Sequence, residues 1–240
     1  NMKIFITGVS SGLGLYIAKE FLDSGDEVWG IGRRKFKLKE VDNNLQNIFR
    51  YEQCDTSKGD QVKSVFNKMV KADYIPDRII FCAGSVTEDI TERNFQLCRF
   101  KENYDVNLFG ILYWVELFLP YFIERNQGSF SAISSMSVYR ESRRGRMGYS
   151  SSRIALNKAF ENLCLEYSDS GVKFIVFNMG RMLQKSGVVG VSYSNAAYRI
   201  HKTVKSSGCS RQINIPFFQY ILTRIAQLIP KKIFKSYLMK

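Results

Sequence analysis

The chain has 240 residues, of which 45% are hydrophobic, and this length and composition suit one α/β domain with a single large core. Its formal net charge of +13 is uneven, because residues 170–240 contain twelve Lys and Arg but no Asp or Glu. The longest apolar region, residues 110–123, is interrupted by Glu116 and Pro120 and is shorter than the roughly 20 residues of a membrane span, which argues against a transmembrane protein.

Cysteine usage and the N-terminal segment predict a cytoplasmic protein. The five cysteines are scattered and form no C-x-x-C or histidine-paired pattern, so we expect a reducing compartment and no metal site. The opening stretch "MKIFITGVSSGLG" turns to glycine and serine where the apolar part of a signal peptide would have to continue.

Strands and helices are predicted to alternate along the chain. A strand at 4–6, a glycine turn, a helix at 15–22 and a second strand at 28–31 make one βαβ unit. Further strands are expected at 48–54, 78–84, 128–135 and 172–180, and further helices at 60–72, 103–122 and 149–168. This alternation predicts an α/β fold: a Rossmann-type doubly wound parallel sheet in three α/β/α layers, forming one domain over residues 1–240.

The glycine turn predicts a nucleotide site. Thr7-Gly8-x-x-x-Gly12-x-Gly14 follows a strand and opens a helix, so backbone N–H groups and the helix N-terminus can receive a pyrophosphate. A turn that merely needs positive φ would explain one glycine better than three.

The end of the second strand bears on the choice of dinucleotide. An acidic residue there would bind the ribose 2′-hydroxyl of NAD, but Gly32 is followed by Arg33 and Arg34. Guanidinium groups suit a 2′-phosphate, so NADP is favoured over NAD. The alternative is that these arginines are ordinary surface charge.

The stretch "YSSSR" pairs Tyr149 with Arg153, one helical turn apart. A fixed cation beside a phenol favours the phenolate and makes the tyrosine a candidate acid. Arg, unlike Lys, cannot pass a proton on. As an isolated spacing, the pair also fits two unrelated surface residues.

Taken in order, these motifs resemble the short-chain dehydrogenase/reductase family over residues 2–184. The resemblance implies a cofactor loop formed by Thr7, Gly8, Ser10, Ser11, Gly12, Leu13 and Gly14. It further implies cofactor contacts at Asp55 and Thr56 in "CDTS", at Ala83 and Gly84, and at Gly180 and Gln184 after the last core strand. The family has a Pro-Gly and a Thr around those last two positions, so this end of the site departs from the pattern.

The same resemblance implies a carbonyl reductase with four catalytic residues. Tyr149 matches the family's catalytic tyrosine, Asn107 its helix asparagine and Ser135 its serine, with Ser134 as the neighbouring candidate. Arg153 stands where the family has lysine. This departure leaves open an alternative, a non-catalytic NADP-binding sensor or scaffold with a degenerate active site.

The resemblance places a substrate lid at residues 185–215, and this lid is basic and free of acidic residues. Four more cations lie between Ser135 and Tyr149, namely Arg140, Arg143, Arg144 and Arg146. We therefore expect an anionic carbonyl or alcohol substrate, such as a phosphorylated or nucleotide-linked sugar or a carrier-bound acyl group, and no nucleic acid. The resemblance also implies a homodimer or homotetramer built on the long helices 104–123 and 150–168.

The C-terminal segment, residues 216–240, is amphipathic and basic. Gln219, Thr223 and Gln227 form a narrow polar stripe at helical spacing, opposite a wide apolar one. Such a segment can lie peripherally on an anionic membrane. It can equally pack on its own domain or on a sister subunit.

Overall fold

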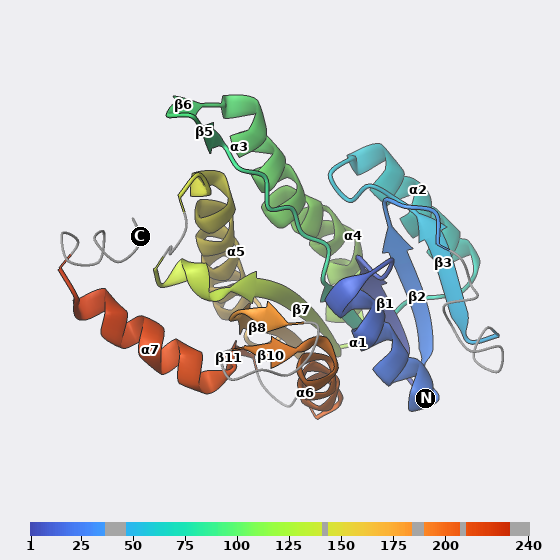
Figure 1. The fold of residues 1–240 in the computed structure, drawn as a ribbon. Helices are drawn as coiled ribbons and strands as arrows, with labels where there is room; N and C mark the ends of the chain where they lie inside the picture. The colour runs from blue at the N-terminus through green and yellow to red at the C-terminus, as the bar shows by residue number, and fades with distance from the viewer. Residues whose placement is uncertain (37–46, 141–143, 184–189, 207–209, 231–240) are drawn as a thin grey trace.

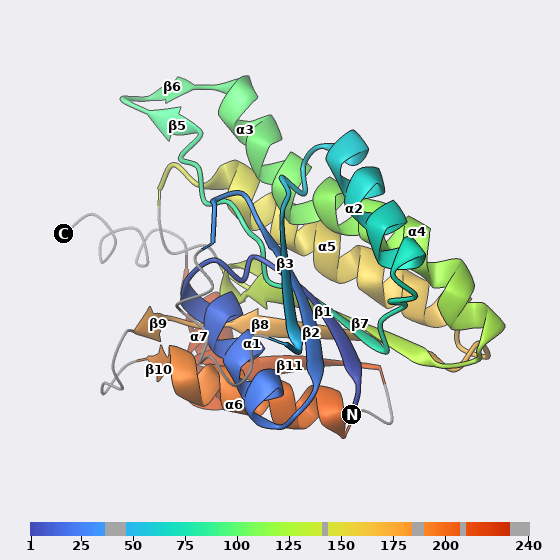
Figure 2. The ribbon, with the colours of Figure 1, turned by 90° about the vertical axis from the view of Figure 1, so that its right-hand side faces the viewer.

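The computed structural model describes residues 1–36, 47–140, 144–183, 190–206 and 210–230. Seven parallel strands form its central sheet (Figures 1 and 2). From edge to edge they are β11 (Arg211–Ile215), β8 (Val172–Met179), β7 (Gly128–Ser135), β4 (Arg78–Phe81), β1 (Lys3–Thr7), β2 (Glu27–Gly32) and β3 (Phe49–Gln53). The predicted Rossmann-type fold is confirmed, and the strand order reverses between β1 and β4, where such sheets bind ligands.

Helices cover both faces of the sheet (Figure 2). One face carries α1 (Gly12–Asp23) and α6 (Tyr193–Lys205); the other carries α2 (Gly59–Lys71), α4 (Gly110–Glu124) and α5 (Met147–Glu166). Side chains alternate along each strand, so in β1 Phe5 joins the core beneath α4 while Ile4 and Ile6 join the core beneath α1. Both faces of the strand are buried, which explains its continuous apolar sequence.

The long helix predicted at 103–122 is assembled from three pieces. The α3 helix (Leu97–Tyr104) passes through a π-helical segment, Asp105–Phe109, into α4. The combined stretch Leu97–Glu124 is long and apolar enough to cross a membrane, but 56% of its apolar window is buried inside the fold. Its apolar character is thus explained by packing against the sheet.

The segment expected to form the substrate lid contributes partly to the framework. Within residues 185–215, α6 packs against α1, and β11 extends the main sheet beside β8. The short pair of β9 (Met182–Leu183) and β10 (Val191–Ser192) stands apart from the main sheet, and so does the hairpin of β5 (Ile90–Thr91) and β6 (Asn94–Phe95). The sequence analysis did not predict α6 or β11.

An ion pair between the buried Asp26 and the exposed Lys205 joins α6 to the turn after α1, and it predicts a pH dependence of stability. Lys205 Nζ lies 2.8 Å from a carboxylate oxygen of Asp26, which also accepts hydrogen bonds from Ser24 and the Met2 amide. Burial by itself raises the pKa of Asp26, but these hydrogen bonds outweigh it and hold the pKa below its ordinary value. A lowered pKa stabilises the fold above the unfolded-state value, near 4, and this contribution is lost as the pH falls further.

We therefore expect wild type to be more stable than Asp26→Asn at neutral pH, and the difference to shrink as the pH falls below about 4. Urea unfolding across this range measures it. A difference that is constant with pH would contradict the assigned ion pair.

Candidate active site

The carboxyl ends of β1, β2, β3 and β4 border a cavity of about 510 Å³. Its lining brings together nine of the predicted cofactor residues: Gly8, Ser10, Ser11, Arg33, Arg34, Asp55, Thr56, Ala83 and Gly84. The cavity extends from the glycine loop to the end of β4, and its size suits a dinucleotide.

The glycine loop is shaped by close backbone approach. Gly8 has a φ of +80°, and a Cβ there would lie 2.7 Å from the amide nitrogen of Ala83. A Cβ on Gly14 would lie 2.2 Å from the Gly8 carbonyl oxygen. Larger residues would push α1 off the loop, so the glycines keep the helix N-terminus open toward the cavity. Thr7 lies beneath, where its hydroxyl accepts a hydrogen bond from the Ala83 amide (3.1 Å) and joins β1 to the β4 loop.

The two arginines after β2 line the cavity beside the glycine loop. Both side chains are exposed, and Arg34 donates a hydrogen bond to the Ser11 hydroxyl, so its guanidinium reaches back to the glycine loop. Gln53 from β3 donates to the Arg33 carbonyl oxygen (2.8 Å) and fixes the backbone. Two cations therefore border the cavity at this end, and the Arg34 guanidinium is held against the glycine loop.

The predicted cofactor contacts after β3, Asp55 and Thr56, form hydrogen bonds within the fold. Asp55 accepts hydrogen bonds from the Ser57 amide (3.0 Å) and hydroxyl (2.8 Å). The buried Thr56 hydroxyl donates to the Gly110 carbonyl oxygen and accepts from the Trp114 indole. Thr56 thus anchors α4, and its hydroxyl is not directed at a ligand.

The cavity also holds two thiols. Removal from water raises the pKa of both Cys54 and Cys82 to about 12, although the nearby Arg153 acts in the opposite direction on Cys82. Both thiols stay protonated at neutral pH, which argues against thiolate chemistry here.

Arg153 is the buried cation of the site. Its guanidinium carbon lies 5.5 Å from the centre of the Tyr149 ring, and Nη1 donates to the Ile133 carbonyl oxygen of β7 (2.9 Å). A Cβ on Gly84 would lie 2.4 Å from Nη2, so only glycine leaves room for this planar group. Arg153 is only 5% exposed, and these contacts hold its positive charge between Tyr149 and the cavity wall at Gly84.

Asn107 lies in the π-helical segment and is fully buried. Its amide exchanges two hydrogen bonds with the backbone of Ser85, each 2.9 Å long, and donates to the Ser152 hydroxyl (3.1 Å). Ser152 in turn donates to the Tyr149 carbonyl oxygen (2.8 Å). This chain connects the loop after β4 with the helix that carries Tyr149.

The two candidate serines at the end of β7 differ in exposure. Ser134 is buried, whereas Ser135, the last residue of the strand, is partly exposed. The Ser135 hydroxyl accepts a hydrogen bond from the Ser137 amide (3.1 Å) and keeps its own proton available for donation. Ser135 is therefore the better hydrogen-bond donor of the two.

Other predicted residues lie elsewhere. Gly180 packs against Gln219, and a Cβ there would lie 2.0 Å from the Gln219 side-chain oxygen. Gln184 and Arg143 fall outside the described residues. Arg146 lies 4.0 Å from a Glu88 carboxylate oxygen.

Asp89 is a residue that the sequence analysis missed. It is fully buried, and its carboxylate accepts hydrogen bonds from the Met147 amide (3.1 Å) and the Gly148 amide, at the N-terminus of α5. A carboxylate there satisfies free helix N–H groups and complements the helix dipole. It positions the first turn of α5, which carries Tyr149. The sequence offered no signal, since the cap comes from 58 residues upstream.

We expect Asp89→Asn to lower the free energy of unfolding by about 1–3 kcal/mol, because an amide cannot accept both bonds without presenting an NH₂ group to a donor. Urea unfolding measures this loss. Glu88→Gln, its exposed neighbour, is the control and should unfold like wild type. Equal stability of both variants would show that Asp89 does not hold the helix.

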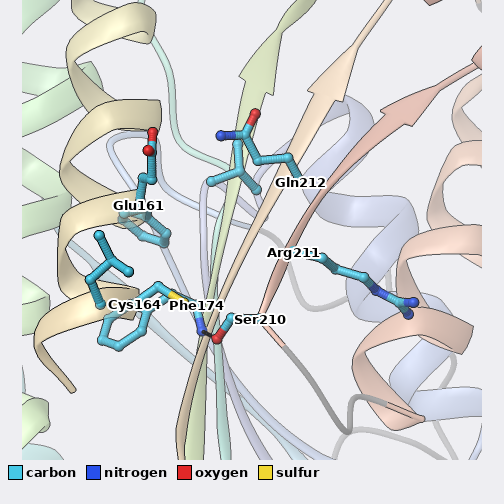
Figure 3. A pocket seen from close by; sticks show the side chains of 9 residues that line it. Glu161, Cys164, Phe174, Ser210, Arg211 and Gln212 are labelled. Carbon is cyan, nitrogen blue, oxygen red and sulfur yellow. Dashed lines mark hydrogen bonds between the residues drawn. The ribbon is translucent and has the colours of Figure 1, made fainter. Parts of the chain in front are cut away.

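A second cavity, of about 180 Å³, lies between the C-terminal half of α5 and strands β8 and β11 (Figure 3). Its walls include Glu161, Cys164, Phe174 and Gln212. None of the predicted site residues lines it, so the candidate active site is the larger cavity.

Comparisons with known proteins show the family of the chain. A family model described as short chain dehydrogenase matches residues 2–187. An uncharacterized oxidoreductase of Staphylococcus epidermidis is 27% identical over 180 residues, 73% of this chain and 75% of that protein.

Solved structures share the fold. Serine dehydrogenase in its closed form, complexed with NADP⁺, superposes with a TM-score of 0.79 at 17% identity, over 89% of this chain and 94% of that one. A 4-hydroxyisoleucine dehydrogenase complexed with NADH gives 0.75 at 20% identity, over 89% and 97%. The chain belongs to the short-chain dehydrogenase family and is an NAD(P)-dependent oxidoreductase.

Proposed function

We propose that the protein is an NADPH-dependent reductase of an anionic carbonyl compound. The observation that carries this proposal is the larger cavity, which has exposed Arg33 and Arg34 at one end and, at the other, Gly84 against the buried Arg153 beside Tyr149. The exposed arginines suit a phosphate of the dinucleotide. The buried cation beside a tyrosine suits the carbonyl group that reacts.

The residues present fit a nicotinamide dinucleotide. The Gly8 and Gly14 backbone would hold the pyrophosphate, and Arg33 and Arg34 the ribose 2′-phosphate. When bound, the nicotinamide supplies a hydride to the carbonyl carbon. The two solved structures compared above carry NADP⁺ and NADH, so the preference for NADP rests on the two arginines.

Side chains of the protein donate the proton to the alkoxide and stabilise the negative charge that develops. The Tyr149 hydroxyl donates a proton to the developing alkoxide, and Ser135 donates a hydrogen bond to the same oxygen. Arg153 holds positive charge beside the phenolate that remains. Asn107 acts through Ser152 and positions the first turn of α5.

The exposed Arg144 and Arg181 support the choice of an anionic substrate, since they stand on the two segments that follow β7 and β8. A phosphorylated or nucleotide-linked sugar and a carrier-bound acyl group both fit this charge. The exposed apolar residues Tyr113, Ile123, Ile154 and Leu165 on α4 and α5 support a homo-oligomer built on these helices. We place the protein in the cytoplasm.

The test is a fluorescence titration with NADPH and NADH, followed by a carbonyl panel weighted toward phosphorylated and nucleotide-linked sugars. Tighter binding of NADPH and its oxidation by an anionic member support the proposal. Failure to bind either cofactor would overturn it, and binding without turnover of any carbonyl would favour the non-catalytic alternative.

We expect Arg34→Gln to weaken NADPH binding by about tenfold or more, because a hydrogen bond to a charged phosphate contributes about 1.5–3 kcal/mol. NADH has no 2′-phosphate, so its affinity should change little. The control is Arg93→Gln, an exposed arginine outside the cavity. Equal losses for NADPH and NADH would show that Arg34 does not read the phosphate.

A further inference from the structure

Helix α7 (Phe217–Leu228) turns its polar stripe toward the protein. The buried Gln219 accepts a hydrogen bond from the Arg181 amide (2.8 Å), and Gln227 donates to the Tyr139 carbonyl oxygen. Thr223 donates to the Gln219 carbonyl oxygen within the helix (2.8 Å). This is the reverse of an ordinary surface helix, which buries its apolar stripe.

The apolar side of α7 faces outward. Its exposed members are Phe217, Phe218, Ile221, Leu222, Ile225 and Leu228. At about 100° per residue these six fall within an arc of about 140°, opposite the glutamine stripe. Leu222 is 57% exposed and Leu228 is 84% exposed, so neither is covered by this chain. We call this surface the α7 apolar face, and its contiguity marks it as an interaction surface.

We propose that the α7 apolar face docks on the surface of an anionic lipid bilayer. Charge complementarity selects this occupant. Arg224 lies exposed at the border of the arc, and the sequence directly after the helix adds Lys231, Lys232, Lys235 and Lys240. Apolar side chains in the acyl boundary and cations at anionic headgroups are the two contributions that hold an interfacial helix.

A second copy of the chain is the weaker occupant. Residues 170–240 contain no carboxylate side chain, so a two-fold contact between two α7 faces would bring cations of both copies together without a partner. Anionic lipid supplies the missing negative charge.

The docked helix would also border the active site. Tyr139 and Arg140, in the loop between Ser135 and Tyr149, both contact α7: Tyr139 packs on Tyr220 (5.1 Å between ring centres), and Arg140 donates to the Ile229 carbonyl oxygen (3.3 Å) just beyond the helix. The bilayer would therefore lie beside the segment that carries the catalytic residues. This consequence rests on the proposed function, whereas docking itself does not.

The experiment is co-sedimentation of the full chain with phosphatidylcholine vesicles that do or do not contain phosphatidylserine, at low and high salt. We expect binding to the anionic vesicles, weakened by salt. Leu222→Glu should reduce it by about tenfold or more, because the change removes apolar burial and adds repulsion. The matched control is Leu97→Glu, at a leucine of α3 that is 54% exposed and should leave binding unchanged.

Three outcomes would overturn the proposal. The full chain could ignore anionic vesicles, or Leu222→Glu could bind them like wild type, which would assign binding to the lysines alone. If wild type does not bind the vesicles and its oligomeric mass falls in Leu222→Glu, the face belongs to an interface with a second copy. If Leu222→Glu keeps the circular dichroism spectrum and the NADPH affinity of wild type, the variant is folded. Loss of membrane docking is then distinguishable from loss of the proposed activity.

Discussion

Tyr149→Phe is expected to lower kcat by about 10²–10⁴-fold, the usual contribution of a positioned general acid, while NADPH affinity changes little. The substitution removes only the phenolic oxygen. The ring stays beside the Arg153 guanidinium, and the Ser152 bond to the Tyr149 carbonyl oxygen is a backbone contact that phenylalanine keeps. Steady-state turnover with the best carbonyl of the panel, beside NADPH titration, measures both quantities.

Tyr167→Phe is the matched control, because Tyr167 follows the C-terminal end of the same helix and packs on Phe174. It should leave kcat unchanged. If Tyr149→Phe turns over like wild type, the acid is another group and the assignment of this helix to catalysis is wrong. If neither wild type nor variant turns over any carbonyl, the non-catalytic alternative is favoured.

Arg153→Met is expected to lower kcat by about a hundredfold, because it removes a preorganised charge from beside the tyrosine in a site shielded from water. Arg153→Lys should restore charge but not geometry. A lysine ammonium cannot fill the planar space against Gly84 while it donates to the Ile133 carbonyl oxygen, so we expect a loss of about tenfold.

Lys158→Met serves as the control for both variants, since Lys158 is an exposed cation of the same helix, paired with Glu161 at 2.9 Å. Its kcat should match wild type. A gain of activity in Arg153→Lys would contradict this expectation. It would mean that the site keeps a geometry suited to lysine and that Arg153 impairs the enzyme. Thermal unfolding of each variant separates lost catalysis from lost folding.

Local sequence patterns predicted most of the fold. The apolar runs at 4–6, 78–84 and 172–180 became β1, β4 and β8, because strands buried on both faces are apolar at successive positions. The glycine spacing predicted the loop correctly for a similar reason, since a positive φ at Gly8 and close packing at Gly14 are requirements of the backbone itself.

The elements that were missed depend on distant partners. The α6 helix carries its buried apolar residues at helical spacing, namely Ala196, Ala197, Ile200 and Val204, but it was not predicted from them. It packs on α1, and β11 forms by pairing with β8. Asp89 reaches the N-terminus of α5 across 58 residues of sequence. Two of the basic residues that suggested an anionic substrate are engaged within the protein, Arg140 with the α7 end and Arg146 with Glu88.

By itself, then, the sequence determined the doubly wound sheet, the glycine loop after β1 and the closeness of Tyr149 to Arg153, because each depends on short spacings that fix local backbone geometry. Only the tertiary structure decided which way α7 faces, how Arg153 is fixed against Gly84, and which cations are already paired. The helical period of the sequence shows that α7 has a polar and an apolar stripe. Which stripe is buried depends on the groups that the rest of the chain places beside the helix. Here these are the Arg181 amide and the Tyr139 carbonyl oxygen, to which the glutamines of α7 form hydrogen bonds.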